Sequence, residues 1–242
     1  MLLFDVGNSR CKWAWVENSE WQRQGAFNNN DAASWQKLKE TFSGLAAPQK
    51  ILVSNVAGAD AEYKLRELCA AWAMPLEFIV ALAEQCGVHN AYEQPLQLGC
   101  DRWAALIAAW HHVHGATLVV SCGTATTVDA LTEQGEFLGG LILPGMELMQ
   151  RSLLGSTAHL GMEMGEPRSF PRNTADAIVS GVIRATAGAV QYQYNLLASQ
   201  GNNPRCLVSG GAASMLVPCL NIKAEQVDNL VLKGLQIIGS CN

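Results

Sequence analysis

The sequence predicts an α/β fold built from two similar units, each with a mixed β-sheet flanked by helices. Short apolar runs of strand length alternate with segments that show the apolar spacing of amphipathic helices. An apolar strand followed by a polar glycine turn opens the chain, and the same pattern begins again near residue 117. At 242 residues, the chain is long enough to bury one large core or two smaller ones.

In the first half, strand-like and helix-like segments alternate. Trp35, Leu38, Phe42 and Leu45, for example, recur at the spacing of one helix face. Residues 84–99 contain Gln, Asn, Gly and Pro without periodicity, which predicts a loop. The expected elements are a hairpin over 1–16, helices over 31–46, 63–72 and 102–112, and strands over 51–56 and 76–80.

From residue 115 the order of elements begins again with β-rich segments. Glycine turns at 123–124 and 134–135 separate apolar runs of strand length. The two β-rich beginnings predict a duplicated unit, with domains over 1–114 and 115–242 and a cleft between them. The expected elements are strands over 117–121, 126–131, 137–143 and 206–209, and helices over 174–198 and 230–239.

Composition excludes several classes of protein. Hydrophobic residues make up 49% of the chain and charged residues 15%, which excludes a disordered chain. The net charge of −5 argues against a nucleic-acid surface. No apolar run approaches the roughly 20 residues that span a bilayer, and no signal peptide precedes the first strand. The eight cysteines contain no CxxC pair, so we expect reduced thiols, no membrane partner and a cytoplasmic protein.

Three glycine turns follow apolar strands, at residues 5–9, 121–125 and 209–212. Glycine lets the backbone approach an anion closely, and small polar side chains add donors, so each turn is a candidate phosphate loop. Each is also compatible with an ordinary hairpin turn. Neither GxxxxGK[ST] nor a GxGxxG after a strand occurs, which argues against P-loop and dinucleotide-binding folds.

Asp101 and Arg102 stand where the long loop over 84–99 enters a helix. Asp101 is placed either to cap this helix or to act as a general base for an alcohol that attacks a phosphoryl group. Arg102 is either a surface charge or a group that binds a substrate carboxylate. A cation at a helix start opposes the helix dipole, which favours the functional interpretation.

Six motifs occur in a set order along nearly the whole chain. They are FDVGNSRCKW at 4–13, GCDR at 99–102, CGTATTVD at 122–129, GGLILPG at 139–145, RNTADAI at 172–178 and SGG at 209–211. With these motifs the chain resembles the type III pantothenate kinases, which belong to the superfamily of actin and the acetate and sugar kinases. The set is specific, although no single motif is.

The resemblance implies two ribonuclease H-like (actin-like) domains with mixed sheets flanked by helices and a cleft between them. It also implies ATP-dependent phosphorylation of pantothenate to 4'-phosphopantothenate, the first step of coenzyme A biosynthesis, with Mg²⁺ and in a homodimer. An accessory or regulatory protein that keeps the kinase fold is the alternative, and a sugar or acetate kinase of the same superfamily is a third reading.

The resemblance also implies roles for individual residues. Asp101 matches the catalytic base, and Asp5 matches the residue that organises Mg²⁺ through water. The matched residues fall into three groups. The first phosphate loop comprises Asp5, Val6, Gly7, Asn8, Ser9, Arg10, Cys11 and Lys12, and the other nucleotide loops comprise Gly123, Thr124, Gly210 and Gly211. The pantothenate site comprises Tyr92, Gly99, Cys100, Asp101, Arg102 and Thr174. The resemblance implies that Thr174 acts across the dimer interface.

One position departs from the family pattern. Ser121 stands where the family usually has an aspartate that resembles a ligand of a monovalent cation, K⁺ or NH₄⁺. A neutral hydroxyl is a poorer partner for a cation than a carboxylate. We therefore expect activity to depend less on such ions than is usual in the family. Cys100 stands where the family commonly has a smaller residue such as alanine, a substitution that should be tolerated.

Overall fold

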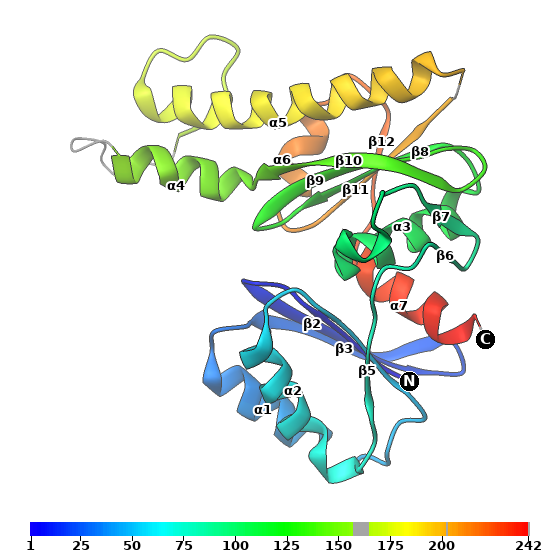
Figure 1. The fold of residues 1–242 in the computed structure, drawn as a ribbon. Coiled ribbons are helices and arrows are strands. Elements are labelled where there is room, and N and C mark those ends of the chain that lie inside the picture. Colours follow the sequence, from blue (N-terminus) through cyan, green and yellow to red (C-terminus); the bar gives the residue numbers. More distant parts are fainter. Residues whose placement is uncertain (157–164, 202, 242) are drawn as a thin grey trace. The chain divides into compact units, whose positions relative to one another are not determined.

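The computed structural model describes residues 1–156, 165–201 and 203–241 (Figure 1). Contacts between residues divide the chain into one unit of Met1–His111 with Leu230–Asn242 and a second unit of His112–Asn229. The expected domains of 1–114 and 115–242 placed the C-terminal segment in the second unit, whereas its contacts group it with the first. No described helix combines the length and apolar character needed to cross a membrane.

The first unit is built on a five-stranded mixed sheet in the order β3-β2-β1-β4-β5. β1 pairs antiparallel with β2 and parallel with β4, so the sheet changes direction at β1. The elements are β1 (Leu2–Val6), β2 (Arg10–Glu17), β3 (Glu20–Asn28), α1 (Ala32–Phe42), β4 (Ile51–Asn55), α2 (Ala59–Cys69), β5 (Leu76–Phe78), β6 (Glu84–Gln85), β7 (Val88–Asn90), α3 (Cys100–Val113) and α7 (Leu230–Ser240), with short 3₁₀ turns at Ala70–Trp72 and Pro95–Gln97.

The core of the first unit lies between this sheet and helices α1 and α2. Aromatic side chains fill much of it: the Trp13 and Phe42 rings meet edge-on with centroids 5.1 Å apart, and Phe4 is fully buried. Helix α7 packs against β1 and β4. Gly234 of α7 lies so close to Ala104 of α3 that a Cβ atom there would sit 1.9 Å from the Ala104 carbonyl oxygen. Helix α3 is thereby held in place by α7.

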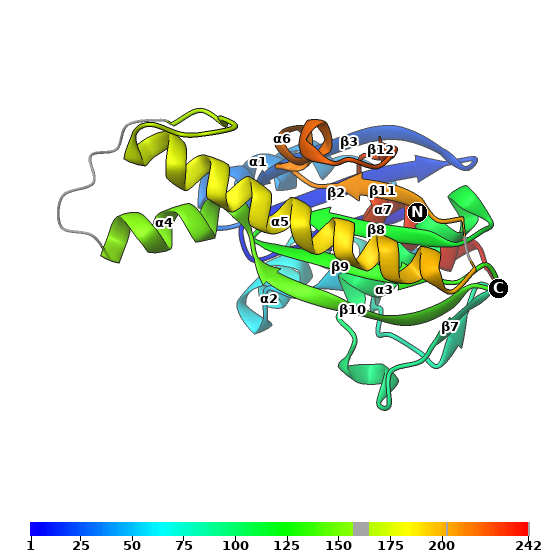
Figure 2. The same ribbon diagram turned by 90° about the horizontal axis from the view of Figure 1, so that it is seen from above.

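The second unit repeats the plan of the first. Its strands lie in the order β12-β11-β8-β9-β10, with β8 antiparallel to β9 and parallel to β11. Helix α5 runs along this sheet and contacts β8, β9 and α4 (Figure 2). The elements are β8 (Thr117–Cys122), β9 (Ala125–Leu131), β10 (Glu136–Pro144), α4 (Met146–Ser156), α5 (Thr174–Ser199), β11 (Arg205–Ser209), α6 (Ala213–Leu216), a 3₁₀ turn at Val217–Cys219 and β12 (Ala224–Gln226).

The two sheets confirm the predicted α/β fold with mixed sheets flanked by helices. In each unit, three strands that follow one another in sequence pair antiparallel, and two further strands extend them in parallel on the side of the first strand. The expectation of a plain loop over residues 84–99 was incomplete. That segment contains the β6–β7 hairpin, in which Glu84 pairs with His89, and the second 3₁₀ turn.

Candidate active site

The first part of the site is the end of strand β1. Asp5 lies opposite Lys12 in the antiparallel β1–β2 pair, so the carboxylate and the ammonium group extend from the same face of the sheet. On the other side, Asp5 lies level with Ser54 of the parallel strand β4. The alternation of the strand, with Phe4 and Val6 in the core, turns the Asp5 side chain to the opposite face from these two residues.

Helix α3 brings the second acid to this strand end. Cys100, its first residue, lies with Sγ 3.4 Å from Ser54 Oγ and 3.6 Å from the carbonyl oxygen of Asn55. Asp101 therefore lies in the first turn of α3 rather than at the N-cap, and its Oδ1 accepts the Arg102 N–H at 2.8 Å. A Cβ atom on Gly99 would lie 2.7 Å from Asp101 Oδ1, so glycine leaves room for the carboxylate.

Asp5 is the electrostatic centre of this group. Burial raises its pKa to about 6; the nearby Lys12 ammonium opposes the rise, and the Asp101 carboxylate adds to it. The structure thus brings together Asp5, Lys12 and Asp101, whose charges act on one another. Raised carboxylate pKa values next to a second acid are typical of sites that handle protons or cations.

Arg102 and Tyr92 form the next part of the site. The Arg102 side chain is buried, with 7% of the residue exposed, and Nη1 donates to the Tyr92 hydroxyl at 3.1 Å. The guanidinium carbon also lies 5.8 Å from the centre of the Tyr92 ring. The burial of this guanidinium argues against the surface role that was the alternative for Arg102.

The turn between β1 and β2 exposes its central residues, whereas strand residues on either side of it are buried. Val6 and Cys11 are fully buried in the first core, so they can meet a ligand only through backbone atoms. Asn8, Ser9 and Arg10 are exposed. The Gly7 N–H donates to the Arg10 carbonyl oxygen at 2.9 Å, which closes the turn.

The second unit brings its two glycine turns together at one edge of its sheet. Ser121 and Ser209 are level with each other in the parallel β8–β11 pair, so the turns that follow them are adjacent. Gly210 has a φ of 101°. A Cβ atom on it would lie 2.3 Å from the Cys122 carbonyl oxygen. Gly123 and Thr124 are exposed beside them, as expected of a loop that receives a ligand.

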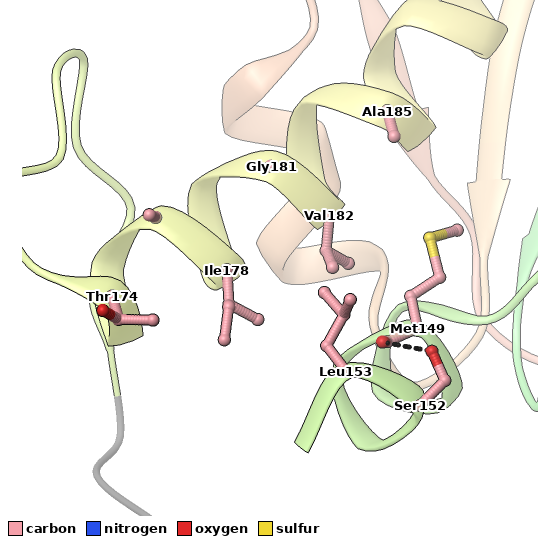
Figure 3. Close-up of a pocket in the computed structure, with 9 residues that line it drawn as sticks. Met149, Ser152, Leu153, Thr174, Ile178, Gly181, Val182 and Ala185 are labelled. Atoms are coloured by element: carbon pink, nitrogen blue, oxygen red, sulfur yellow. Dashed lines mark hydrogen bonds between the residues drawn. The ribbon is translucent and has the colours of Figure 1, made fainter. Parts of the chain in front are cut away.

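Thr174 lies apart from these turns. It is the first residue of α5, exposed, and follows the N-cap Asn173, whose side chain accepts the Asp176 N–H. It borders a largely apolar cavity of about 500 Å³ between α4 and α5 (Figure 3). The lining residues are Met149, Ser152, Leu153, Thr174, Ala177, Ile178, Gly181, Val182 and Ala185.

Sequence reasoning missed three residues near the first turn. Ser54 and Asn55 contact Cys100 at the start of α3. The sequence contains a pattern that could have identified them, because an apolar strand ends there in polar residues. Asn29 bonds to the turn itself, yet it stands in a run of three asparagines that carries no distinguishing pattern. Only the pairing of distant segments identifies Asn29.

The matched family model and similar curated proteins carry the same description. A family model described as type III pantothenate kinase matches residues 1–196. A type III pantothenate kinase of Nitrosospira multiformis is 45% identical over 239 residues, covering 98% of this chain and 90% of that protein. One of Aromatoleum aromaticum is 44% identical, covering 98% and 97%. A solved Sinorhizobium meliloti structure described as a 2-dehydro-3-deoxygalactonokinase superposes with a TM-score of 0.60 at 15% identity, covering 98% and 97%, and supports the fold alone.

Proposed function

Since this chain belongs to the type III pantothenate kinase family, we propose that it phosphorylates pantothenate with ATP, using Asp101 as the general base. The product is 4'-phosphopantothenate, the first intermediate on the route to coenzyme A. The observation that carries the residue assignment is the grouping of Asp5, Lys12 and Asp101 at the end of β1.

The chemical step needs a base beside the acceptor alcohol. The Asp101 carboxylate takes the proton of the primary hydroxyl as the hydroxyl oxygen attacks the γ-phosphorus of ATP, and ADP leaves. Its place in the first turn of α3 orients the carboxylate, because the Arg102 N–H occupies one oxygen. Most of the rate enhancement is expected from positioning and electrostatics, with the base contributing about 10²–10⁴-fold.

Arg102 is proposed to bind the carboxylate end of pantothenate. A guanidinium can form two parallel bonds to a carboxylate, and Tyr92 holds this one in a fixed direction. Gly99 and Cys100 complete this segment, with Gly99 leaving room for Asp101. The same glycine would therefore be needed for the base as well as for the substrate.

The nucleotide side is proposed to use the backbone of three turns. Residues 8–10 of the first unit, and residues 124 and 210–211 of the second, are proposed to supply N–H donors for the phosphates, since the Gly7 and Gly123 N–H groups donate to carbonyl groups of their own turns. A kinase of this family is expected to use a divalent cation. The described residues contain no cluster of three or more metal-binding side chains. This fits an ion held mainly by phosphate oxygens, with Asp5 acting through water, where it neutralises phosphoryl charge.

The Asp101 assignment is tested by Asp101→Asn. We expect kcat to fall by about 10²–10⁴-fold because the amide cannot accept the proton, while ATP still binds. Glu93→Gln, an exposed carboxylate next to Tyr92, is the matched control and should keep full activity. A near-normal kcat in Asp101→Asn would refute the assignment.

ADP release with pantothenate, glucose, acetate or no acceptor distinguishes the substrate classes. Release that no acceptor stimulates would indicate an accessory protein.

We further propose that turnover depends little on K⁺ or NH₄⁺, because position 121 offers a hydroxyl where a carboxylate would bind the ion more tightly. The half-buried Ser121 lies in β8 just before the Gly123 turn. Activity should change less than about twofold when KCl replaces a tetraalkylammonium salt at constant ionic strength, and Ser121→Asp should increase the dependence. Strong K⁺ activation of the unmodified enzyme would contradict this proposal.

A homodimer in the cytoplasm is proposed as the working form. Large apolar side chains are exposed on β10, α4 and α5, which is typical of a protein interface. They are Ile142, Leu148, Leu153, Tyr192 and Leu196. The exposed Thr174 lines the same cavity as Leu153, in keeping with a role across the interface. All eight cysteines are free thiols, which suits a reducing compartment that contains ATP.

A further inference from the structure

Asn29 lies directly behind the turn that joins β1 to β2. It follows β3 and is 6% exposed. Its Nδ2 donates to the Gly7 carbonyl oxygen at 3.1 Å, and its backbone N–H donates to the Ser9 carbonyl oxygen at 3.0 Å. One buried residue therefore binds two carbonyl groups of this turn from the protein side.

Asn29 is itself fixed by the core. Trp35 Nε1 donates to the Asn29 carbonyl oxygen at 2.9 Å, and the Trp35 ring meets Phe27 edge-on with centroids 5.0 Å apart. Trp35 belongs to the core of the first unit. The position of the turn is thus connected through Asn29 to close-packed aromatic side chains, which shift little.

The bonds determine which polar groups of the turn lie inward. The carbonyl groups of Gly7 and Ser9 accept bonds from Asn29, and that of Arg10 accepts the Gly7 N–H. Each carbonyl oxygen carries a partial negative charge that would repel a phosphate oxygen. With these carbonyls engaged, the side left for a phosphate is the one on which successive N–H groups can form an anion-binding concavity.

The Asn29 side chain forms its bond to Gly7 at a cost in stability. Its Oδ1 is buried and has no hydrogen-bond partner among the residues that the structure describes. A buried acceptor without a partner destabilises the folded state, so an apolar side chain of the same volume would avoid this penalty. What such a side chain could not supply is the donor to Gly7.

We propose that Asn29 is a positioning residue for the first phosphate loop. It keeps the carbonyl groups of Gly7 and Ser9 turned inward, so that the loop presents N–H groups to the phosphates of ATP. This inference rests on the proposed function, because it assumes that the turn binds ATP. Asn29 acts through the turn and does not touch the substrate.

The test is Asn29→Leu, which keeps the branching and the number of side-chain heavy atoms and removes the donor to Gly7. We expect the Kd for MgATP, measured by calorimetry without pantothenate, and the KM for ATP to rise about tenfold, because one positioning hydrogen bond is lost. The KM for pantothenate should stay within about twofold, because Arg102 and Tyr92 are untouched. Asn30→Leu, at the exposed neighbouring position, is the matched control and should leave both constants unchanged.

Asn29→Asp serves as a second variant if the leucine variant does not fold. It keeps the shape but cannot donate to Gly7 when ionised, so it should also weaken ATP binding. A melting temperature that falls in both variants while the Kd for MgATP stays unchanged would overturn the inference, since Asn29 would then be purely structural. Failure of the unmodified protein to bind MgATP would overturn it as well. ATP binding without pantothenate-stimulated ADP release would instead contradict the proposed function.

Discussion

Asp5 shows how a residue proposed to serve catalysis can lower the stability of the folded state. Its carboxyl stands at the end of an otherwise apolar strand, and burial raises its pKa to about 6. Because the pKa in the folded state lies above that in the unfolded state, Asp5 favours folding only while it is protonated. That advantage is lost as the pH rises through about 6.

Asp5→Asn is therefore expected to stabilise the protein at neutral pH while abolishing activity. At about 1.4 kcal/mol per pKa unit, the free energy of unfolding at pH 7.5 should rise by at most about 3 kcal/mol. The gain should shrink toward zero near pH 4, where both side chains are neutral. Urea unfolding without ATP or Mg²⁺ measures it, with Asp228→Asn, at an exposed position, as control. A variant less stable than the unmodified protein at pH 7.5 would contradict this account.

At the scale of elements, helix α3 is the part whose placement matters most. Its first turn carries Cys100, Asp101 and Arg102, and its position is determined at two places: the Cys100–Ser54 contact and the close approach of α7 at Gly234. A change far from the first turn can therefore reach the site by moving the whole helix.

Gly234→Ala should show this coupling. The added Cβ would lie 1.9 Å from the Ala104 carbonyl oxygen, so the two helices must separate. We expect a loss of about 1–3 kcal/mol in the free energy of unfolding and a lower kcat. Gly188→Ala in α5 is the matched control, since its Cβ meets nothing within 4 Å, and should stabilise by about 0.5–1 kcal/mol. Equal effects of the two substitutions would show that helix spacing does not matter.

Elements with strong local patterns were predictable from the sequence. The long helix over 174–198 is observed as Thr174–Ser199, and the strand over 51–56 as Ile51–Asn55. Strand β3 was missed because its residues are largely polar and exposed, which leaves no apolar alternation to detect. In the site, Asp101 and Arg102 stood out by their place at a helix start. Asn29 did not, since its role arises from contacts across 22 residues of sequence.

At the scale of the whole molecule, the apolar surface on β10, α4 and α5 leads to a prediction about assembly. Leu153 and Ile178 border the cavity beside Thr174, on two different helices (Figure 3). Leu153→Glu should dissociate the proposed homodimer, because a buried unpaired charge is unfavourable at an interface. Light scattering after size-exclusion chromatography measures the mass. Tyr63→Glu, at an exposed apolar residue of α2, is the control. A monomer for the unmodified chain would contradict the proposal.

The grouping of α7 with the first unit has a consequence for the order in which the molecule is made. Ribosomes synthesise β1 before the second unit and α7 after it, yet β1 and α7 pack against each other. The first unit therefore cannot bury the face of β1 and β4 that α7 covers until α7 has been synthesised. The second unit, whose residues are continuous in sequence, has all its strands available earlier. Although Asp5 and the proposed base Asp101 lie in the segment that is translated before the second unit, the unit they belong to is completed after it.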